Sequence, residues 1–380
     1  MEKAKVYFTD FRTHGGESLL VKMQHLMKMA GFENIDFQDK FVAIKIHLGE
    51  PGNLSYLRPN WAKAVCDYVK KLGGKPYLTD CNTLYVGGRK NAIDHLDSAY
   101  TNGFNPLATG VQTIIADGLR GLDERDMPVP NGEYCKTAKI GSAIAEADII
   151  ISMTHFKGHV SAGFGGCIKN IGMGSGSRSG KQIMHSEGQP AVSKSKCVGC
   201  KTCEKNCAHE GIKVVDRVAV IDPAKCLGCG RCIAVCPKDA IHSNWDGSAE
   251  SLSCKMAEYT WAVVNGKPNF HITFLMDVSP DCDCEGHNDM PIIPDVGMFA
   301  SFDPVAIDQA CVDAANAQPI IENSVLGDKV KAEKEEGCCC HEHGHDHFKM
   351  LHPDTAWEAA IAHGEKLGMG TKEYELITMK

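Results

Sequence analysis

The feature that most constrains this chain is a four-cysteine pattern that occurs twice. The segments CVGCKTCEKNCAHEGI (197–212) and CLGCGRCIAVCPKDAI (226–241) align at an offset of 29 residues with their cysteines matched. In each copy, two, two and three residues separate successive cysteines. Such a repeat predicts two pseudo-symmetric halves that contribute to shared sites. We therefore expect this part of the chain to fold around its thiolates, because its apolar core is small.

The spacing predicts two 4Fe–4S clusters with crosswise ligands. A tight loop of this kind offers three thiolates to one cluster, and in two-cluster ferredoxins the fourth cysteine binds the other cluster. The expected ligands are Cys197, Cys200, Cys203 and Cys236 for one cluster and Cys226, Cys229, Cys232 and Cys207 for the second. The alternative is a pair of zinc sites. Zinc normally takes two separated Cys-x2-Cys pairs, however, and not a three-cysteine run with an outlying fourth ligand.

Residues 193–244 resemble the bacterial dicluster ferredoxin domain. Pro237 follows the second motif as expected of that domain, whereas Ala208 stands at the matching place after the first. This departure affects the rigidity of a turn and not the ligands. The resemblance implies one-electron transfer, with reduction potentials in a wide window that the sequence does not fix.

The cysteine count and the charge balance limit the classes of protein to consider. Disulfide frameworks belong to small secreted chains, whereas this chain has 380 residues and an odd number of cysteines, 19. Its 40 basic and 48 acidic side chains give a net charge of −8, which argues against nucleic acid and anionic membranes as partners. There is no signal-peptide pattern and no apolar run long enough to span a membrane. We expect a soluble cytoplasmic protein without membrane insertion.

Outside the cysteine repeat, short β-rich runs alternate with amphipathic helical stretches. Strands are predicted at 4–11, 41–48, 75–81, 111–117, 147–154, 269–279 and 292–301, and helices at 17–30, 58–73, 91–104, 251–264 and 303–317. The alternation is typical of an α/β domain with a mostly parallel sheet flanked by helices. In the last helix, Asp303 is placed as the N-cap and Pro304 in the first turn.

The pattern breaks after residue 174, where a Gly- and Ser-rich stretch resembles a linker or a mobile loop. We therefore predict one α/β domain formed by residues 1–190 and 246–380, interrupted by a small α+β ferredoxin-like insertion at 191–245. A separate third domain is the less economical alternative. The run CCCHEHGHDH (338–347) is expected to be a mobile tract that binds metal adventitiously, or is simply disordered.

Several predicted strands end in polar residues that a protein core does not tolerate without partners. Burying each unpartnered group costs about 1–3 kcal/mol, so they are expected to line a wet cleft beyond the carboxyl ends of the strands. The groups concerned are Lys45, His47, Glu50 and Asn53, then Asp80, Cys81 and Asn82, then His155, Lys157 and His159, and finally Asp277 and residues 281–284.

The segment HFKGHVSAGFGGCIKNIGMG (155–174) is the richest of these. In an extended chain, His155, Lys157 and His159 share one side. Gly165 and Gly166 would let the backbone approach a ligand. The following CIKNIG is expected to begin a helix whose N-terminus favours an anion, with Lys169 as a mobile positive charge. The alternative is a flexible connection with solvated histidines.

A second candidate metal site is the pair Cys282 and Cys284, whose sulfurs can point at one metal ion. The same spacing also allows a strained disulfide, and the acidic neighbours of the pair allow a plain surface loop.

Five motifs together resemble the uncharacterised iron–sulfur centre proteins that carry domain of unknown function 362. They are KIHLGE, DCNTLYVGGRKNAIDH, HFKGHVSAGFGGCIKNIGMG, the cysteine repeat and DVSPDCDCEGHNDMPIIPDVGMFASFDPVAID, and they cover most of Met1 to Asn316. The His- and Cys-rich tract is outside the pattern. The resemblance implies an α/β domain with a ferredoxin insertion, and no settled reaction.

Our functional hypothesis is an anaerobic redox protein whose clusters pass single electrons to or from a site in the α/β domain. Lys45, Lys157, Lys169 and Arg58 would position a small anionic substrate, and a histidine would supply protons near neutral pH. The expected site is formed by Lys45, His47, Asp80, Asn82, His155, Lys157, His159 and Lys169, with Gly165 and Gly166 shaping the pocket. The electron partner is unidentified. The alternatives are a non-catalytic electron carrier or metal and cluster donor, and a non-redox enzyme whose clusters are structural or sense oxygen.

Overall fold

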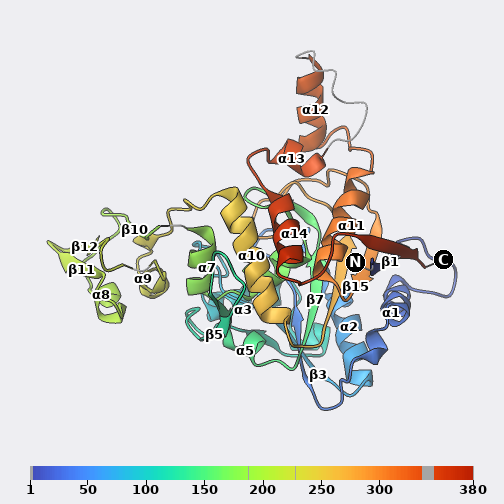
Figure 1. Ribbon diagram of the computed structural model, residues 1–380, viewed down its shortest axis with the longest axis horizontal. Coiled ribbons are helices and arrows are strands. Elements are labelled where there is room, and N and C mark those ends of the chain that lie inside the picture. Colours follow the sequence, from blue (N-terminus) through green and yellow to red (C-terminus); the bar gives the residue numbers. More distant parts are fainter. Residues whose placement is uncertain (1–2, 187, 227, 336–345, 380) are drawn as a thin grey trace.

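The centre of the molecule is an eight-stranded sheet (Figure 1). The computed structural model describes residues 3–186, 188–226, 228–335 and 346–379. In spatial order the strands are β16 (Tyr374–Thr378), β1 (Ala4–Asp10), β15 (Gly297–Ser301), β14 (Asn269–Leu275), β7 (Ile149–His155), β2 (Phe41–Lys45), β3 (Lys75–Asp80) and β4 (Thr113–Ile115). β15 runs antiparallel to both of its neighbours, and every other neighbouring pair is parallel. The predicted α/β fold with a mostly parallel sheet is confirmed.

Alternation along the strands buries both faces of this sheet. In β7, Ile149 and Ile151 enter one apolar core, and Ile150 between them enters the other. A strand covered on both faces has no solvent side, which is why β7 reads as a continuous apolar run in the sequence.

Helices cover each face. One face carries α1 (Leu19–Met29), the 3-10 helix Phe32–Asn34, α2 (Pro59–Lys71), α3 (Ala92–Thr101) and α4 (Pro106–Thr109). The other carries α5 (Ser142–Ala145), α6 (Cys167–Ser175), α10 (Ala249–Val264), α11 (Pro304–Asn316), α12 (Val325–Glu335), α13 (His347–Leu351) and α14 (Trp357–Lys366). As predicted, Asp303 caps α11, accepting from the backbone N–H groups of Val305 and Ala306 at 2.8 and 2.9 Å.

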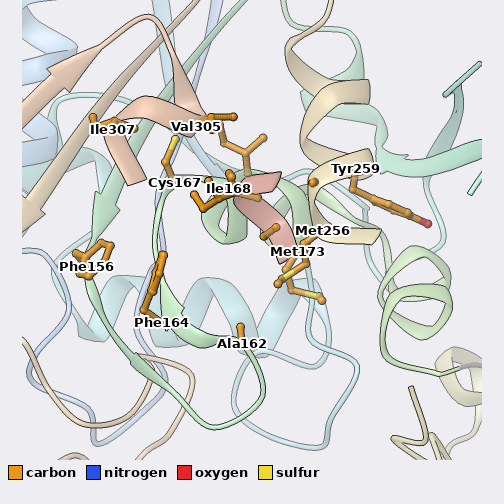
Figure 2. Close-up of a cluster of buried hydrophobic side chains, with 14 of the residues drawn as sticks. Phe156, Ala162, Phe164, Cys167, Ile168, Met173, Met256, Tyr259, Val305 and Ile307 are labelled. Atoms are coloured by element: carbon orange, nitrogen blue, oxygen red, sulfur yellow. The ribbon is translucent and has the colours of Figure 1, made fainter. Parts of the chain in front are cut away.

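The second face is packed tightly around α6 and α10. Figure 2 shows Ile168 and Met173 of α6 beside Met256 of α10, with Phe164 below them. A side chain at Gly172 would overlap the Met256 carbonyl oxygen and lie 2.7 Å from Thr260 Oγ1. Glycine is therefore required at this helix crossing because the two backbones approach too closely for a Cβ atom.

We expect Gly172→Ala to lower the free energy of unfolding. Alanine favours the helix by about 1 kcal/mol, but forcing a methyl group against a backbone carbonyl costs about 1–3 kcal/mol or more, so a net loss of about 2 kcal/mol is expected. Urea denaturation would measure it. Gly15→Ala is the control, since no atom lies within 4 Å of an added Cβ there. Equal stability of the two variants would contradict the packing argument.

Two short antiparallel hairpins lie outside the large sheet: β5 (Glu124–Pro128) with β6 (Thr137–Gly141), and β8 (Lys157–His159) with β9 (Gly163–Gly165).

The segment after residue 174, which the sequence predicts to be a linker or mobile loop, contains a helix instead. Eight of its residues form α7 (Arg178–His185), and most of these eight are buried. Ser177 caps this helix by accepting from Gly180 N–H at 3.1 Å. A run rich in Gly and Ser here packs closely because small residues let α7 lie against its neighbours.

The cysteine repeat forms a small module that projects from the α/β body (Figure 1). Its elements are β10 (Ala191–Val192), α8 (Thr202–Asn206), β11 (Ile212–Val215), β12 (Val218–Ile221), α9 (Arg231–Val235) and β13 (Ile241–His242). β10 pairs with β13, and β11 pairs with β12, so each ribbon takes one strand from each half. The backbone conformation also follows the repeat. Gly199 and Gly228, which occupy matching positions, both have positive φ, at 67° and 69°.

The predicted tract 338–347 is described only at its end. Residues 338–345 lie outside the described part of the chain. Asp346 caps α13 by accepting from the N–H groups of Phe348 and Lys349, and His347 is buried with Nε2 3.0 Å from the Gln318 carbonyl oxygen. These last two residues are therefore part of the packed structure.

Candidate functional site

The module contains two cavities, each lined by four of its cysteines. The first, of about 320 Å³, is lined by Cys197, Cys200, Cys203 and Cys236, and the second, of about 370 Å³, by Cys207, Cys226, Cys229 and Cys232. The structure thus brings together the two quartets that the spacing predicts, with one cysteine of each quartet coming from the other repeat.

Backbone N–H groups point at sulfurs in both cavities. Gly211 N–H donates to Cys207 Sγ at 3.2 Å, and the matching Ala240 N–H donates to Cys236 Sγ at 3.3 Å. Ala219 N–H donates to Cys197 Sγ at 3.3 Å. Such donors stabilise thiolates and the sulfurs of bound metal clusters.

A larger cavity, of about 650 Å³, lies at the carboxyl ends of β2 and β3 and beyond β7. We call it the deep cavity. Of the predicted site residues, its walls contain Lys45, His47, Asp80, Lys157, His159, Gly165, Lys169 and Cys284. These residues follow four different strands or lie on α6. The strand ends therefore converge on one cavity, as the polar residues after them predict.

Four other candidates lie away from the deep cavity. Asn82 is buried against Asp117, to which its Nδ2 donates at 2.8 Å. Gly166 lies against Asp308. Arg58 is exposed and pairs with Asp277 at 3.3 Å. The fourth candidate, His155, is buried behind the residues that line the deep cavity.

His155 is fully engaged by hydrogen-bond acceptors. Its Nδ1 lies 2.8 and 3.0 Å from the two carboxylate oxygens of Asp283, and its Nε2 lies 2.9 Å from the Met276 carbonyl oxygen. Acceptors therefore face both ring nitrogens, and neither nitrogen is free for a substrate or a metal ion. Lys157 Nζ reaches the same carboxylate at 3.3 Å. The arrangement positions Asp283 and Lys157, and the catalytic role predicted for His155 has no geometric basis.

The expected anion site at the start of α6 is occupied by the chain itself. Asp308 accepts from the N–H groups of Cys167 and Ile168 at 2.5 and 2.9 Å. Burial raises the pKa of this carboxyl to about 7, although the two backbone donors oppose the shift. The helix N-terminus does favour an acceptor, but the acceptor is an internal side chain. Asp308 lies 141 residues after Cys167 in the sequence, and no local pattern pairs the two.

Several residues of the deep cavity were missed from the sequence. They are Arg89, Tyr85, Lys181, His185 and Trp245. Arg89 lies in the motif DCNTLYVGGRKNAIDH, in which the adjacent basic residues Arg89 and Lys90 are the signal that indicates it. Lys181 and His185 lie on α7, in the stretch predicted to be a linker. The hydrophobic residues of RSGKQIMH are too few to reveal a buried helix.

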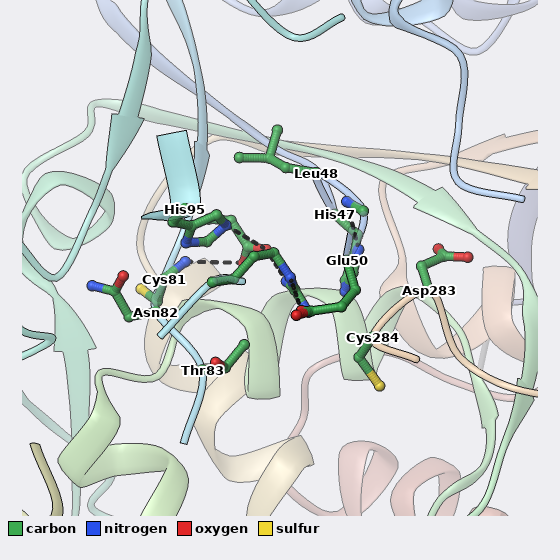
Figure 3. A network of polar contacts seen from close by, with 12 residues as sticks. His47, Leu48, Glu50, Cys81, Asn82, Thr83, His95, Asp283 and Cys284 are labelled. Carbon is green, nitrogen blue, oxygen red and sulfur yellow. Dashed lines mark hydrogen bonds and ion pairs between the residues drawn. The ribbon is translucent and has the colours of Figure 1, made fainter. Parts of the chain in front are cut away.

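A buried charge network forms the floor of the deep cavity (Figure 3). Asp80 accepts from Lys45 Nζ at 3.0 Å and lies 3.4 Å from Arg89 Nη1. Arg89 Nε also donates to Glu50 at 2.8 Å. Burial alone would raise the pKa of Asp80, but the charge of Lys45 and its basic neighbours hold it well below the usual range. The carboxylate is therefore ionised, and its role is to hold two buried cations in place.

The histidines of the deep cavity are neutral at pH 7. Burial and the nearby Lys169 lower the pKa of His159 to about 4, and burial lowers the pKa of His185 to about 3. Burial followed by the charge of Arg89 also lowers the pKa of His47. These rings do not fit the expectation that a histidine supplies protons near neutral pH. They are suited to donate or accept hydrogen bonds.

The Cys282–Cys284 loop forms one side of the deep cavity. Sulfurs of both cysteines and a ring nitrogen of His159 lie within 4.8 Å of one another. Lys169 Nζ donates to Cys282 Sγ at 3.4 Å, so Lys169 is held in place and is not mobile as expected. The hydrogen bond from Cys284 lowers the pKa of Cys282, burial opposes this, and the charge of Lys169 adds to it.

The module contacts the wall of the deep cavity. Leu84 lines the cavity and also packs in the apolar cluster of the module, with Cys203 and Ile233 among its members. On the same side, Lys90 Nζ pairs with Asp239 of the module at 2.5 Å. One buried side chain thus borders both the cysteine module and the deep cavity.

Comparison with known proteins gives one family match. The model of the family "Domain of unknown function (DUF362)" matches residues 42–313. No curated protein matches the chain. Among the described residues, there is also no helix with the length and apolar character needed to cross a membrane.

Two solved structures are similar to parts of the chain. One is the lactate racemase apoprotein from Thermoanaerobacterium thermosaccharolyticum, with 13% identity and a TM-score of 0.36 over 72% of this chain and 51% of that chain. The other is a protein from Thermotoga maritima, with 11% identity and a TM-score of 0.40 over 80% of this chain and 60% of that chain. The chain spans 51–60% of the length of these two proteins.

Proposed function

Since the family match spans more than half of the chain, the chain belongs to the DUF362 family, and we propose that it is an iron–sulfur redox protein. Two 4Fe–4S clusters in a ferredoxin-like module at 191–245 would pass single electrons to or from a substrate or cofactor in the deep cavity. The observation that carries this proposal is the pair of four-cysteine cavities.

The separation of the sulfurs favours clusters over zinc. In a tetrahedral zinc site with Zn–S bonds of about 2.3 Å, the sulfurs lie about 3.8 Å apart. Among the described residues, which include all eight repeat cysteines, the trio of His159, Cys282 and Cys284 is the one group with three or more ligand atoms within 4.8 Å of one another. Each quartet is therefore too open for a single ion. A cubane fits because each thiolate binds a different iron, and the backbone donors to sulfur suit it as well.

The charges of the deep cavity favour an anionic substrate. Among the described residues that line it, five are Lys or Arg and one is Asp. Lys45 and Arg89 are neutralised by Asp80 and Glu50, and Lys157 by Asp283. Lys181 donates to the Gly176 carbonyl oxygen at 2.5 Å and Lys169 to a sulfur. The ammonium groups of these two lysines are best placed to bind an anion.

In this proposal the chain's own side chains bind and orient the substrate and exclude water from the cavity. Clusters of this kind supply one-electron oxidation and reduction when bound. The network around Asp80 fixes the floor of the cavity, Lys169 and Lys181 hold the anion, and Leu84 separates the cavity from the module. A built cavity beside the module favours an enzyme over the alternative of a simple electron carrier, which needs no substrate pocket.

Anaerobic purification followed by metal analysis and EPR tests the proposal. We expect roughly eight iron and eight sulfide per chain, and about two unpaired spins per chain after full reduction. Zinc in place of iron, or far fewer than eight iron atoms, would remove the basis of the redox function.

A second experiment separates the enzyme from the carrier. Reduced protein is mixed with anaerobic cell-extract fractions of low molecular mass, and reoxidation is followed by EPR. We expect anionic fractions to reoxidise the wild type faster than Lys181→Met, with the surface variant Lys63→Met as control. Equal rates for all three proteins, with reoxidation by protein fractions alone, would support the carrier.

A further inference from the structure

The Cys282–Cys284 pair has the surroundings of a reactive dithiol. Cys282 is buried, and Cys284 lines the deep cavity. The loop that carries them is fixed on two sides, since Gly158 N–H donates to the Ser279 carbonyl at 2.9 Å and Glu50 N–H to the Asp283 carbonyl at 3.0 Å. The two sulfurs are thus kept together and next to the cavity.

The position of the proton on the His159 ring favours a dithiol over a metal site. Its Nδ1 accepts from the backbone N–H groups of Ser161 and Ala162 at 3.0 and 3.1 Å. The proton of the neutral ring is therefore on Nε2. A metal-bound histidine normally uses one nitrogen as ligand and donates a hydrogen bond from the other. Here the only nitrogen left for a metal carries the proton.

Cys282 has a donor of the kind that a thiolate requires. Lys169 Nζ donates to its sulfur at 3.4 Å, and a ring nitrogen of His159 lies within 4.8 Å of it. Cys81 lines the same cavity without such donors, and its sulfur donates to the Ser175 carbonyl oxygen at 3.3 Å. The wall of the cavity therefore contains Cys284, whose partner Cys282 has a lysine donor, and Cys81, whose proton is engaged.

We propose that Cys282 and Cys284 form a reversible dithiol–disulfide couple that reacts with an anionic disulfide in the deep cavity. The Cys282 thiolate attacks one sulfur of the substrate, so that a mixed disulfide forms and the first substrate thiolate leaves. The Cys284 thiol then gives its proton to the first departed thiolate and attacks Cys282 Sγ, which releases the second thiolate. Overall, one substrate disulfide is reduced to one thiol and one thiolate while the pair is oxidised to a disulfide. The substrate is the oxidant, so this proposal does not depend on the clusters.

Thiol trapping and peptide mass spectrometry test the couple on the anaerobically prepared protein. The probes are oxidised glutathione, an anionic disulfide, and bis(2-hydroxyethyl) disulfide, a neutral one. After an acid quench, free thiols are alkylated and the peptides mapped. We expect a Cys282–Cys284 disulfide that forms faster with oxidised glutathione. Cys81 is the internal control and should stay free.

Variants assign the two roles. In Cys284→Ser, we expect glutathione to remain attached to Cys282 because no second thiol displaces it. Lys169→Met should slow adduct formation about tenfold or more, since it removes the ammonium donor to the thiolate, and His159→Asn should slow it because it removes the ring that lies beside the two sulfurs. Asparagine at 159 can still accept from the backbone of the turn, so the melting temperature should change little. Lys63→Met is the surface control.

Three outcomes would overturn the proposal. They are pair thiols that stay reduced at every probe concentration, a mixed disulfide confined to Cys284, or one equivalent of metal that shields both thiols and is absent from Cys282→Ser. Because each readout is at the level of single peptides, a failure here is distinct from a failure to find iron in the module.

Discussion

Replacing Cys236 by serine is expected to remove one cluster and leave the other intact. Cys236 lies in the cavity whose other three cysteines come from the first repeat. Its loss should therefore lower the iron content from about eight to about four atoms per chain. Cys207→Ser should have the same effect through the other cavity. Iron and sulfide analysis with EPR would measure both variants.

The crosswise pattern is tested by which cysteines remain protected. A cluster shields its ligands from alkylation. In Cys236→Ser we expect Cys226, Cys229, Cys232 and Cys207 to stay protected and the cysteines of the first repeat to be alkylated. The reverse result would mean that each repeat holds its own cluster. That outcome would contradict the ligand assignment while leaving the number of clusters unchanged.

The same substitution should also destabilise the module. Its apolar cluster is small, with Ile212, Ile233 and Ile241 among its buried members. Metal binding supplies much of the folding free energy of such domains. We therefore expect increased proteolysis in residues 191–245 of Cys236→Ser, while the α/β body, which has its own large cores, stays resistant.

The sequence predicts the parts of this protein that depend on local pattern. Seven strands of the large sheet, β1, β2, β3, β4, β7, β14 and β15, and helices such as α2, α10 and α11 follow apolar periodicity, and the predictions overlap these elements. The two cysteine quartets follow from the spacing together with the crosswise ligands of two-cluster ferredoxins. The polar residues after β2, β3 and β7 predict the position of the deep cavity because parallel strands end at one edge.

The remainder depends on contacts between distant segments. Asp308 fills the N-terminus of α6 from α11, and no local pattern pairs the two. His155 follows a strand as a catalytic residue would, yet Asp283, 128 positions away, engages its ring. Lys181 lies in a Gly- and Ser-rich stretch whose small residues indicate a loop. Only tertiary packing makes that stretch a helix.

Asp80→Asn is expected to cause the largest loss of stability of any single change in the deep cavity. The carboxylate is 2% exposed and neutralises two buried cations, Lys45 at 3.0 Å and Arg89 at 3.4 Å. Removing one partner of a buried ion pair leaves an uncompensated charge, which costs about 3–5 kcal/mol. Urea denaturation would measure the loss. Asp67→Asn is the matched control, because the exposed pair of Asp67 and Lys63 contributes about 0.5 kcal/mol or less.

The pH dependence gives the same network a second test. The folded-state pKa of Asp80 is lowered, so its contribution to stability is present above the unfolded-state value of about 3.9 and is lost as the pH falls through the folded-state pKa. Wild-type stability should therefore fall steeply below about pH 4, and Asp80→Asn should lack this part of the fall. Adding Lys45→Met to Asp80→Asn should restore part of the stability, because it removes the buried cation that is left without a carboxylate, whereas Arg89 keeps its ion pair with Glu50. If the double variant is no more stable than Asp80→Asn, the loss comes from packing and not from charge.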